Sequence, residues 1–363
     1  MRSRRMVALV AALAPVLVAA CADGGRPARW VPASPPAATT SPTPTGPPEI
    51  TLAFAGDVHF VDTDGGVPNR TGRLLADPAT AFGPVAEVLS AADVAMVNLE
   101  TAVTTGGTPE PKTFHFRAPP AAFEAVRAAG VDVVSLANNH ALDYGREGLA
   151  DTLAAAADAG IAVVGAGENA AAAYRPWTVE VRGVRIAYLG FSQVYELWES
   201  WRATDDRPGI AYAMDTPRAL AAVRAARGDA DVVVVYMHWG QEGNPCPVPE
   251  MSSFAGELAD AGADLVVGTH AHLLLGDGWL GETYVHYGLG NFLWWRDDRF
   301  NNDTGVLWVT LRGAEIASVQ LRPAVISRET GQPVPATGDD ADRVAAHVAD
   351  LRGCTGLADA PQR

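Results

Sequence analysis

Residues 266–276 read VVGTHAHLLLG and join an apolar run to two histidines. The apolar residues end a predicted buried strand, Gly268 interrupts it, and His270 and His272 follow two positions apart. In an extended segment, residues i and i+2 point to the same side. The spacing therefore predicts that both imidazoles face one place just beyond the end of a strand.

The chain from Ile50 onward alternates short apolar runs with alanine-rich segments. Such runs are typical of strands that are buried on both faces, with helices between them, and they predict an α/β fold. We expect strands at 51–55, 94–97, 131–136, 161–164, 184–190, 232–237, 265–267 and 283–287, and helices at 84–92, 121–129, 147–159, 217–226 and 251–261. Hairpin-like alternation follows at 306–311 and 315–321, and residues 339–351 predict a terminal helix.

Polar side chains follow several of these strands at the point where each strand ends. In open α/β sheets, ligands bind beyond the carboxyl ends of the strands. The strand ends therefore predict one rim that collects carboxylate, amide and imidazole groups. Its members are Asp57, His59, Glu100, Asn138, Asn139, His140, Asp143, His238, Glu242, His270, His272 and Asn291.

Seven members of this rim could bind metal through oxygen or nitrogen, and none offers a thiolate. Such ligands favour Mn²⁺, Fe or Zn²⁺ over a structural cysteine-type zinc site. Seven ligands exceed one tetrahedral ion but fit two divalent ions ~3.5–4 Å apart that share a carboxylate, an arrangement used for attack on phosphorus. The seven are Asp57, His59, Glu100, Asn139, His238, His270 and His272.

Each of these residues, taken alone, could have a structural role instead of binding metal. A histidine at a strand end can be a hydrogen-bonded structural residue, and Asn138-Asn139 can form a left-handed turn. However, five of the eight histidines fall at these strand ends. Their clustering favours a shared site.

The first twenty residues have the pattern of a secretory signal, because arginines precede an apolar run that is too short to span a bilayer comfortably. The sequence Val18-Ala19-Ala20-Cys21 resembles a bacterial lipobox, in which Cys21 becomes the lipidated first residue. Ordinary cleavage that leaves a free thiol is the alternative. We therefore expect a signal peptide at 1–20 and an extracytoplasmic protein that a lipid anchors to the cell membrane.

Composition divides the rest of the chain. Residues 21–48 are rich in Pro, Ser and Thr and predict an extended tether. The predicted domain covers 50–325, and residues 326–363 form a C-terminal tail. Cys246 and Cys354 are an even pair that can form a disulfide in an oxidising compartment or remain two free thiols.

The formal net charge of −15 argues against nucleic acid as a partner. An anionic substrate would need a locally positive site on such a protein. A metal centre would supply one.

Six motifs, in chain order, resemble the bacterial capsule-synthesis family CapA, the poly-γ-glutamate capsule proteins. They are GDVHF (56–60), VNLE (97–100), LANNHALDYG (136–145), MHWGQEG (237–243), GTHAH (268–272) and YGLGNFLW (287–294). The resemblance covers about residues 50–310. This family is related to the calcineurin-like metallophosphoesterases, which implies a four-layer α/β/β/α sandwich.

The resemblance also implies a role for each matching residue. One metal would be held by Asp57, His59, Glu100 and His272, and the second by Glu100, Asn139, His238 and His270, with Glu100 as the bridge. His140 would remain unligated and assist the leaving oxygen. We expect the substrate to contact Asn138, Glu242 and Asn291.

Three positions depart from the usual pattern of the superfamily or the family. The bridging ligand is usually an aspartate, whereas Glu100 has a longer arm. Ala141 stands where an acid usually follows the histidine, which makes Asp143 the nearest substitute, and Ala271 stands where CapA-like proteins usually have proline. The first two departures bear on hydrolytic rate more than on metal binding.

The resemblance implies a role in making, exporting or anchoring an anionic polymer such as poly-γ-glutamate, beside a capsule-synthesis membrane complex. Three kinds of activity stay open. The domain could hydrolyse a phosphoester with two metals, could bind the polymer without catalysis as a module of an export complex, or could hydrolyse amide bonds of the polymer.

The lipobox leads to the first prediction. Cys21→Ser should release the protein from the membrane fraction, because a lipid on Cys21 is the membrane anchor that we expect. Fractionation of cells that express the parent and the variant checks this. A variant that still pellets with membranes after a salt wash would show that the anchor lies elsewhere.

Overall fold

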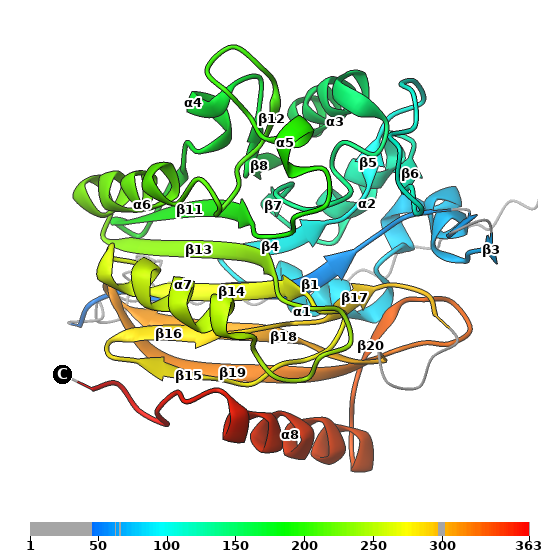
Figure 1. Cartoon of the computed structure of the whole chain (residues 1–363). Helices are drawn as coiled ribbons and strands as arrows, with labels where there is room; N and C mark the ends of the chain where they lie inside the picture. Colours follow the sequence, from blue (N-terminus) through cyan, green and yellow to red (C-terminus); the bar gives the residue numbers. More distant parts are fainter. Residues whose placement is uncertain (1–45, 62, 65–66, 297–301, 363) are drawn as a thin grey trace, which may run out of the picture. The chain divides into compact units, whose positions relative to one another are not determined.

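The computed structural model describes residues 46–362 apart from residues 62, 65–66 and 297–301 (Figure 1). The expected signal peptide, the lipidated Cys21 and residues 21–45 of the tether lie outside the described residues. Within the described part of the chain, no helix is long and apolar enough to cross a membrane.

The larger of two main sheets has eight strands, in the order β20-β19-β18-β1-β4-β7-β8, with β17 paired beside β1. Strands β1, β4, β7 and β8 are parallel, and β18 to β20 add an antiparallel half. The bounds are β1 Glu49–Val58, β4 Val94–Leu99, β7 Val133–Ser135, β8 Ala162–Val164, β17 Asn291–Leu293, β18 Asp303–Arg312, β19 Glu315–Ile326 and β20 Pro333–Pro335.

The smaller main sheet has six strands, in the order β10-β11-β13-β14-β16-β15. Its four inner strands are parallel, and β10 and β15 pair antiparallel at the two edges. The bounds are β10 Trp177–Val181, β11 Val184–Ser192, β13 Val232–Trp239, β14 Leu265–His270, β15 Asp277–Leu280 and β16 Thr283–His286.

Short two-strand ladders and helices complete the chain. The ladders are β2 Thr63–Asp64 with β3 Val67–Pro68, β5 Ala102–Val103 with β6 Arg117–Ala118, and β9 Ala166–Gly167 with β12 Gly209–Ile210. The α-helices are α1 Ala86–Ser90, α2 Ala121–Ala128, α3 Gly145–Ala159, α4 Ala170–Ala173, α5 Trp198–Trp201, α6 Thr216–Asp229, α7 Pro249–Asp260 and α8 Asp339–Leu351. The 3₁₀ turns are Thr71–Ala76, Pro78–Thr80, Gly83–Val85 and Arg352–Cys354.

Successive residues of the central strands pack in two different cores, one on each face of the sheet. Each sheet is therefore covered on both faces, which gives four layers. On β1, Ala53 and Ala55 pack in a core cluster with Phe123 of α2, whereas Leu52 and Phe54 pack in the cluster between the two sheets. Because successive strand residues point to opposite faces, β1 is covered by helices on one side and by the smaller sheet on the other.

Strand β13 of the smaller sheet is buried in the same way. Val234 and Tyr236 face the larger sheet, whereas Val233 and Val235 pack in a cluster that includes Val223 of α6. The Tyr236 hydroxyl donates a hydrogen bond to the Ala55 carbonyl across the two sheets. The order helices, sheet, sheet, helices confirms the four-layer α/β/β/α expectation (Figure 1).

The described residues of the expected C-terminal tail, 326–362, include elements that pack against the rest of the domain. Strand β20 pairs with β19, and α8 has the bounds that the sequence predicted. Val344, Val348 and Leu351 lie three to four residues apart, so they line one face of α8 and pack against Leu274.

The C-terminal segment is also joined covalently to the loop that follows β13. A disulfide links Cys246 and Cys354 across 108 residues. This loop carries Glu242, so the disulfide ties the end of the chain to the rim where the parallel strands end.

Removing this disulfide should destabilise the domain. In the chain-entropy model, closing a loop of about this length contributes ~4–5 kcal/mol. The double variant Cys246→Ala, Cys354→Ala should therefore lose several kcal/mol of unfolding free energy in a denaturant titration. Mass spectrometry of the unreduced parent should show a peptide that links the two cysteines. Quantitative thiol labelling of both without reductant would contradict the linkage.

Candidate metal centre

Asp57 lies near the end of β1 and is fully buried. It follows Gly56, where an added Cβ would lie 1.9 Å from the Gly290 carbonyl oxygen, so only glycine allows this close approach of two backbones. Asp57 Oδ1 accepts a hydrogen bond from Asn98 Nδ2 at 2.8 Å, and Oδ2 accepts one from the His270 backbone N–H at 3.2 Å. Residues of both main sheets therefore fix this carboxylate.

Glu100 follows β4 and is the second fully buried carboxylate. Neither of its oxygens has a hydrogen-bond partner among the described residues. Burial raises the pKa of Glu100 well above its usual range, and the negative charge of Asp57 raises it further. A buried charge is costly unless it is paired or bound to a metal, so this carboxylate fits a bound cation.

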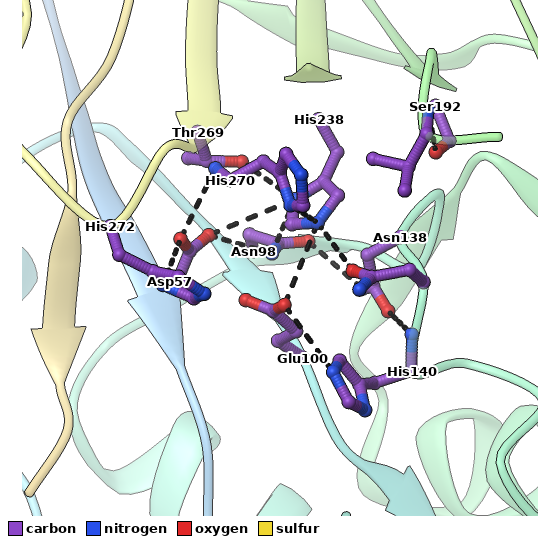
Figure 2. Close-up of polar contacts among 12 residues, drawn as sticks. Asp57, Asn98, Glu100, Asn138, His140, Ser192, His238, Thr269, His270 and His272 are labelled. Carbon is purple, nitrogen blue, oxygen red and sulfur yellow. Dashed lines mark hydrogen bonds and ion pairs between the residues drawn. The ribbon is translucent and has the colours of Figure 1, made fainter. Parts of the chain in front are cut away.

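Four potential ligand atoms converge here, one of which belongs to Glu100. His238 Nε2 lies 3.1 Å from His270 Nδ1 and 3.5 Å from Glu100 Oε1 (Figure 2). The same nitrogen lies 2.8 Å from Asn139 Oδ1. Four ligands at ~2.1 Å around a tetrahedral ion lie ~3.4 Å apart, close to this spacing. Burial lowers the pKa of His238 well below its ordinary value and that of His270 to about 3, so both imidazoles are neutral, as ligands must be.

Thr269 supports His238 from behind. The Thr269 hydroxyl lies 3.2 Å from the Met237 carbonyl, to which it donates, and 3.0 Å from His238 Nδ1. A cation at Nε2 would leave the imidazole proton on Nδ1, where the Thr269 oxygen could accept it; Asn98 Nδ2 lies 3.2 Å from the same nitrogen. Partners of this kind fix the orientation of a metal-binding histidine.

A second group of possible ligands shares Glu100 and consists of Asp57, Glu100 and His272, with ligand atoms within 4.8 Å of one another. His272 Nδ1 lies 3.7 Å from Asp57 Oδ2 and 2.7 Å from Asn291 Oδ1. The Asn291 oxygen accepts the Nδ1 proton, which leaves Nε2 of the imidazole with a free lone pair.

The sequence predicted an extended backbone at His270 and His272, with both imidazoles facing one place. The structure differs from this prediction. Their φ angles are 88° and 59°, in the left-handed region, and not extended. The two imidazoles therefore face different groups of ligands. His270 belongs to the group that contains His238, and His272 belongs to the group that contains Asp57. Such backbone is strained for a residue other than glycine and tends to occur at functional sites.

His59, which the resemblance implied as a ligand, belongs to neither group in this structure. Its ring packs 3.6 Å from that of Trp294 and 4.8 Å from that of Phe116, by centroids. Neither ring nitrogen has a hydrogen-bond partner among the described residues. The structure places His59 in an aromatic wall, and its ligand role stays a prediction.

His140 lies on the opposite side of Glu100, with Nε2 at 3.9 Å from Glu100 Oε1 (Figure 2). Its Nδ1 lies 2.6 Å from Asp143 Oδ2, and its ring stacks on Phe116 at 3.7 Å with 12° between the planes. Asp143 therefore contacts the histidine as an acid at position 141 would be expected to do. Burial raises the pKa of Asp143 to about 7, and it lowers that of His140.

Comparisons with known proteins show the family of the chain. A model of the family described as bacterial capsule synthesis protein PGA_cap matches residues 51–294. The chain belongs to this family. The family that the six motifs indicated is thereby confirmed.

Curated relatives have related descriptions. The chain is 35% identical to the capsule biosynthesis protein CapA of Bacillus anthracis over 62% of its own length, and the match spans 55% of that protein. It is 31% identical to the PGA biosynthesis protein CapA of Bacillus subtilis, in a match that covers 78% of this chain and 74% of that protein. It is 33% identical to a probable polyglutamine synthesis accessory protein of Mycobacterium tuberculosis, in a match that covers 66% of this chain and 67% of that protein.

Solved structures match at lower similarity. The NAD nucleotidase NadN of Haemophilus influenzae has 15% identity and a TM-score of 0.48, with 86% of this chain and 58% of that chain covered. A hypothetical protein from Thermus thermophilus has 15% identity and a TM-score of 0.46, with 79% of this chain and 100% of that chain covered.

The three residues expected to contact a substrate have different surroundings. Asn138 donates both amide protons internally, to Asn98 Oδ1 at 3.0 Å and to the Leu99 carbonyl at 2.9 Å, so we assign it to holding its loop. Asn291 supports His272. Glu242 alone is open to solvent, with 61% of its side chain exposed and Oε1 at 3.9 Å from His272 Nε2.

Sequence analysis missed three residues that build this site. Asn98 donates to Asp57, Thr269 contacts His238, and Lys112 forms an ion pair with Asp143. Asn98 and Thr269 each lie within a quoted motif, so their positions at strand ends were a usable signal. Lys112 lies in an irregular segment that no pattern links to the rim.

Loss of a ligand should lower metal content without unfolding the domain. His270→Ala and Asp57→Ala should each reduce bound metal, because both side chains lie at strand ends and their loss removes little buried apolar area. Elemental analysis of protein purified without chelator, with circular dichroism as a folding check, measures this. His347→Ala is the matched control, because this histidine lies on α8 with 40% of its side chain exposed. A parent without metal, or variants with unchanged metal, would contradict the site.

Proposed function

We propose that the chain is a metal-dependent phosphoester hydrolase that acts in the synthesis, export or anchoring of an anionic capsule polymer such as poly-γ-glutamate. The observation that carries this proposal is that two groups of ligands share Glu100, a buried carboxylate whose oxygens have no other partner among the described residues. A shared carboxylate is the arrangement that brings two ions within ~3.5–4 Å of each other.

We assign one divalent ion to Asp57, Glu100 and His272, and the other to Glu100, Asn139, His238 and His270. Ions in these positions would act as Lewis acids and stabilise negative charge on a phosphoryl group. Ligands of this kind suit Mn²⁺, Fe or Zn²⁺.

The residues around the ions would position the substrate and move a proton. His140 Nε2 faces the centre, and its Nδ1 donates to Asp143, which fixes the tautomer and the ring plane. Burial lowers the pKa of His140, so its imidazolium form would need the negative charge of a bound phosphoester beside it, and the proton on Nε2 could then pass to a leaving oxygen. Phe116 stacks on the ring and limits the access of water on that side.

The polymer context comes from the family. The relatives are described as proteins of capsule, PGA or polyglutamine synthesis, and the proposal extends that context to this chain. Because the net charge is −15, an anionic substrate would approach a repulsive surface. The ions would supply the positive field that such a substrate needs.

We also propose that the protein acts outside the cytoplasm, anchored by a lipid on Cys21 and beside a capsule-synthesis membrane complex. The lipobox-like sequence supports the anchor, and the disulfide between Cys246 and Cys354 fits an oxidising compartment.

The experiment turns on His140, which we do not assign as a ligand. His140→Ala should retain the bound metal and lose ~10²–10⁴-fold in turnover on any phosphoester that the parent cleaves, since a positioned proton donor contributes about this much. Steady-state kinetics and elemental analysis on the same preparations measure both quantities, with His347→Ala as the control.

The opposite result would favour a binding module without catalysis. In that case the metal-loaded parent cleaves no phosphoester across a broad screen but binds poly-γ-glutamate. The His140→Ala variant then also complements a capsule-deficient strain. Release of glutamate oligomers by the parent would instead indicate an amide hydrolase.

A further inference from the structure

Lys112 is a buried cation that the proposed mechanism has not yet used. It lies between β5 and β6, and only 2% of its side chain is exposed. Its ammonium lies 3.0 Å from Asp143 Oδ1 and 3.1 Å from Glu196 Oε2, and it donates a hydrogen bond to the Asn139 carbonyl. The ammonium therefore has one hydrogen bond and two ion pairs with protein oxygens, and its charge is paired inside the protein.

The three partners of Lys112 come from both halves of the fold. Asn139 and Asp143 lie in the loop after β7 of the larger sheet, whereas Glu196 follows β11 of the smaller sheet. The Trp201 ring lies under the ammonium at 5.1 Å from the ring centroid and closes this side. Lys112 thus holds the loop that carries Asn139 and His140 against the opposite sheet.

Asp143 is placed between Lys112 and His140. Its Oδ1 faces the ammonium, and its Oδ2 faces His140 Nδ1 at 2.6 Å and the Phe116 backbone N–H at 2.5 Å. Because Asp143 is fully buried, removal of Lys112 would leave a carboxylate without its cation. The orientation of the His140 imidazole therefore depends on Lys112 through one intervening residue.

We propose that Lys112 is a positioning residue, which acts through Asp143 and the 138–143 loop to hold His140 Nε2 toward Glu100. It touches no reacting atom itself. The inference rests on the proposed function only where it assigns His140 as the proton donor, since the structural chain from Lys112 to His140 does not depend on any activity.

Four variants of the full chain test this proposal. Lys112→Met removes the charge and keeps a long side chain, Asp143→Asn removes the facing charge, and the double variant removes both. Glu196→Gln is the matched control, because it changes the partner of Lys112 that is 43% exposed and leaves the Asp143 contact intact. Thermal unfolding of the parent, the two single variants and the double variant gives a double-mutant cycle.

The unfolding cycle should be non-additive. Lys112→Met should lower the melting temperature most, because it leaves Asp143 buried and unpaired, and adding Asp143→Asn should restore part of the loss. Additive effects would overturn the proposal. If Lys112→Met alone does not fold, the double variant is compared directly with Asp143→Asn, from which it should differ little.

A spectroscopic readout separates positioning from general stability. In protein labelled with ¹⁵N-histidine, the His140 side-chain signal is assigned by its loss in His140→Ala. It should shift in Lys112→Met and in Asp143→Asn and stay in place in Glu196→Gln. An unchanged His140 signal in folded Lys112→Met protein would overturn the proposal.

If the parent cleaves a phosphoester, its steady-state kinetics give a third measurement. Lys112→Met should retain its metal and lose ~10–100-fold in kcat with little change in KM, which is the usual effect of removing a supporting partner. A raised KM with unchanged kcat would mean that Lys112 binds the substrate, contrary to the proposal. A parent without esterase activity defeats the proposed function alone, because the unfolding cycle and the His140 signal still decide the role of Lys112.

Discussion

Two carboxylates, Asp57 and Glu100, are fully buried at the ends of neighbouring strands, and the oxygens of Glu100 have no hydrogen-bond partner among the described residues. Two adjacent negative charges in a low dielectric repel each other and lose the hydration that water would provide. Burial of this kind is tolerated when the groups bind protons or cations. The facing imidazoles are held neutral by their own burial, so they can donate lone pairs but supply no positive charge.

The four-layer fold is what brings these groups together. The larger sheet supplies the carboxylates, through β1 and β4, and the smaller sheet supplies the imidazoles, through β13 and β14. The two sheets are packed through a shared apolar core, and Tyr236 donates across it to the Ala55 carbonyl two residues before Asp57. A cation bound at the rim would join the two sheets at the same end, so metal binding should also stabilise the packing of the sheets.

Local patterns predicted the strands, the helices and most of the rim, whereas the four-layer arrangement was implied by the family resemblance. Apolar runs that end in polar residues indicate parallel strands and the edge at which they deliver side chains, and this is how Asp57, Glu100 and His238 were found. The left-handed backbone at His270 and His272 left no such trace, since glycine usually marks it. Lys112 could not be found either, because a long side chain from an irregular segment reaches Asp143 only through the tertiary fold.

The central claim is that Glu100 lies between two bound cations. Anomalous X-ray scattering from crystals of the protein grown with Mn²⁺ tests it most directly, because it locates the ions without reference to any activity. We predict two anomalous peaks on either side of the Glu100 carboxylate, ~3.5–4 Å apart. One peak would be beside His238 and His270, and the other beside Asp57 and His272. No peak near Glu100, or peaks only at surface carboxylates, would contradict the account.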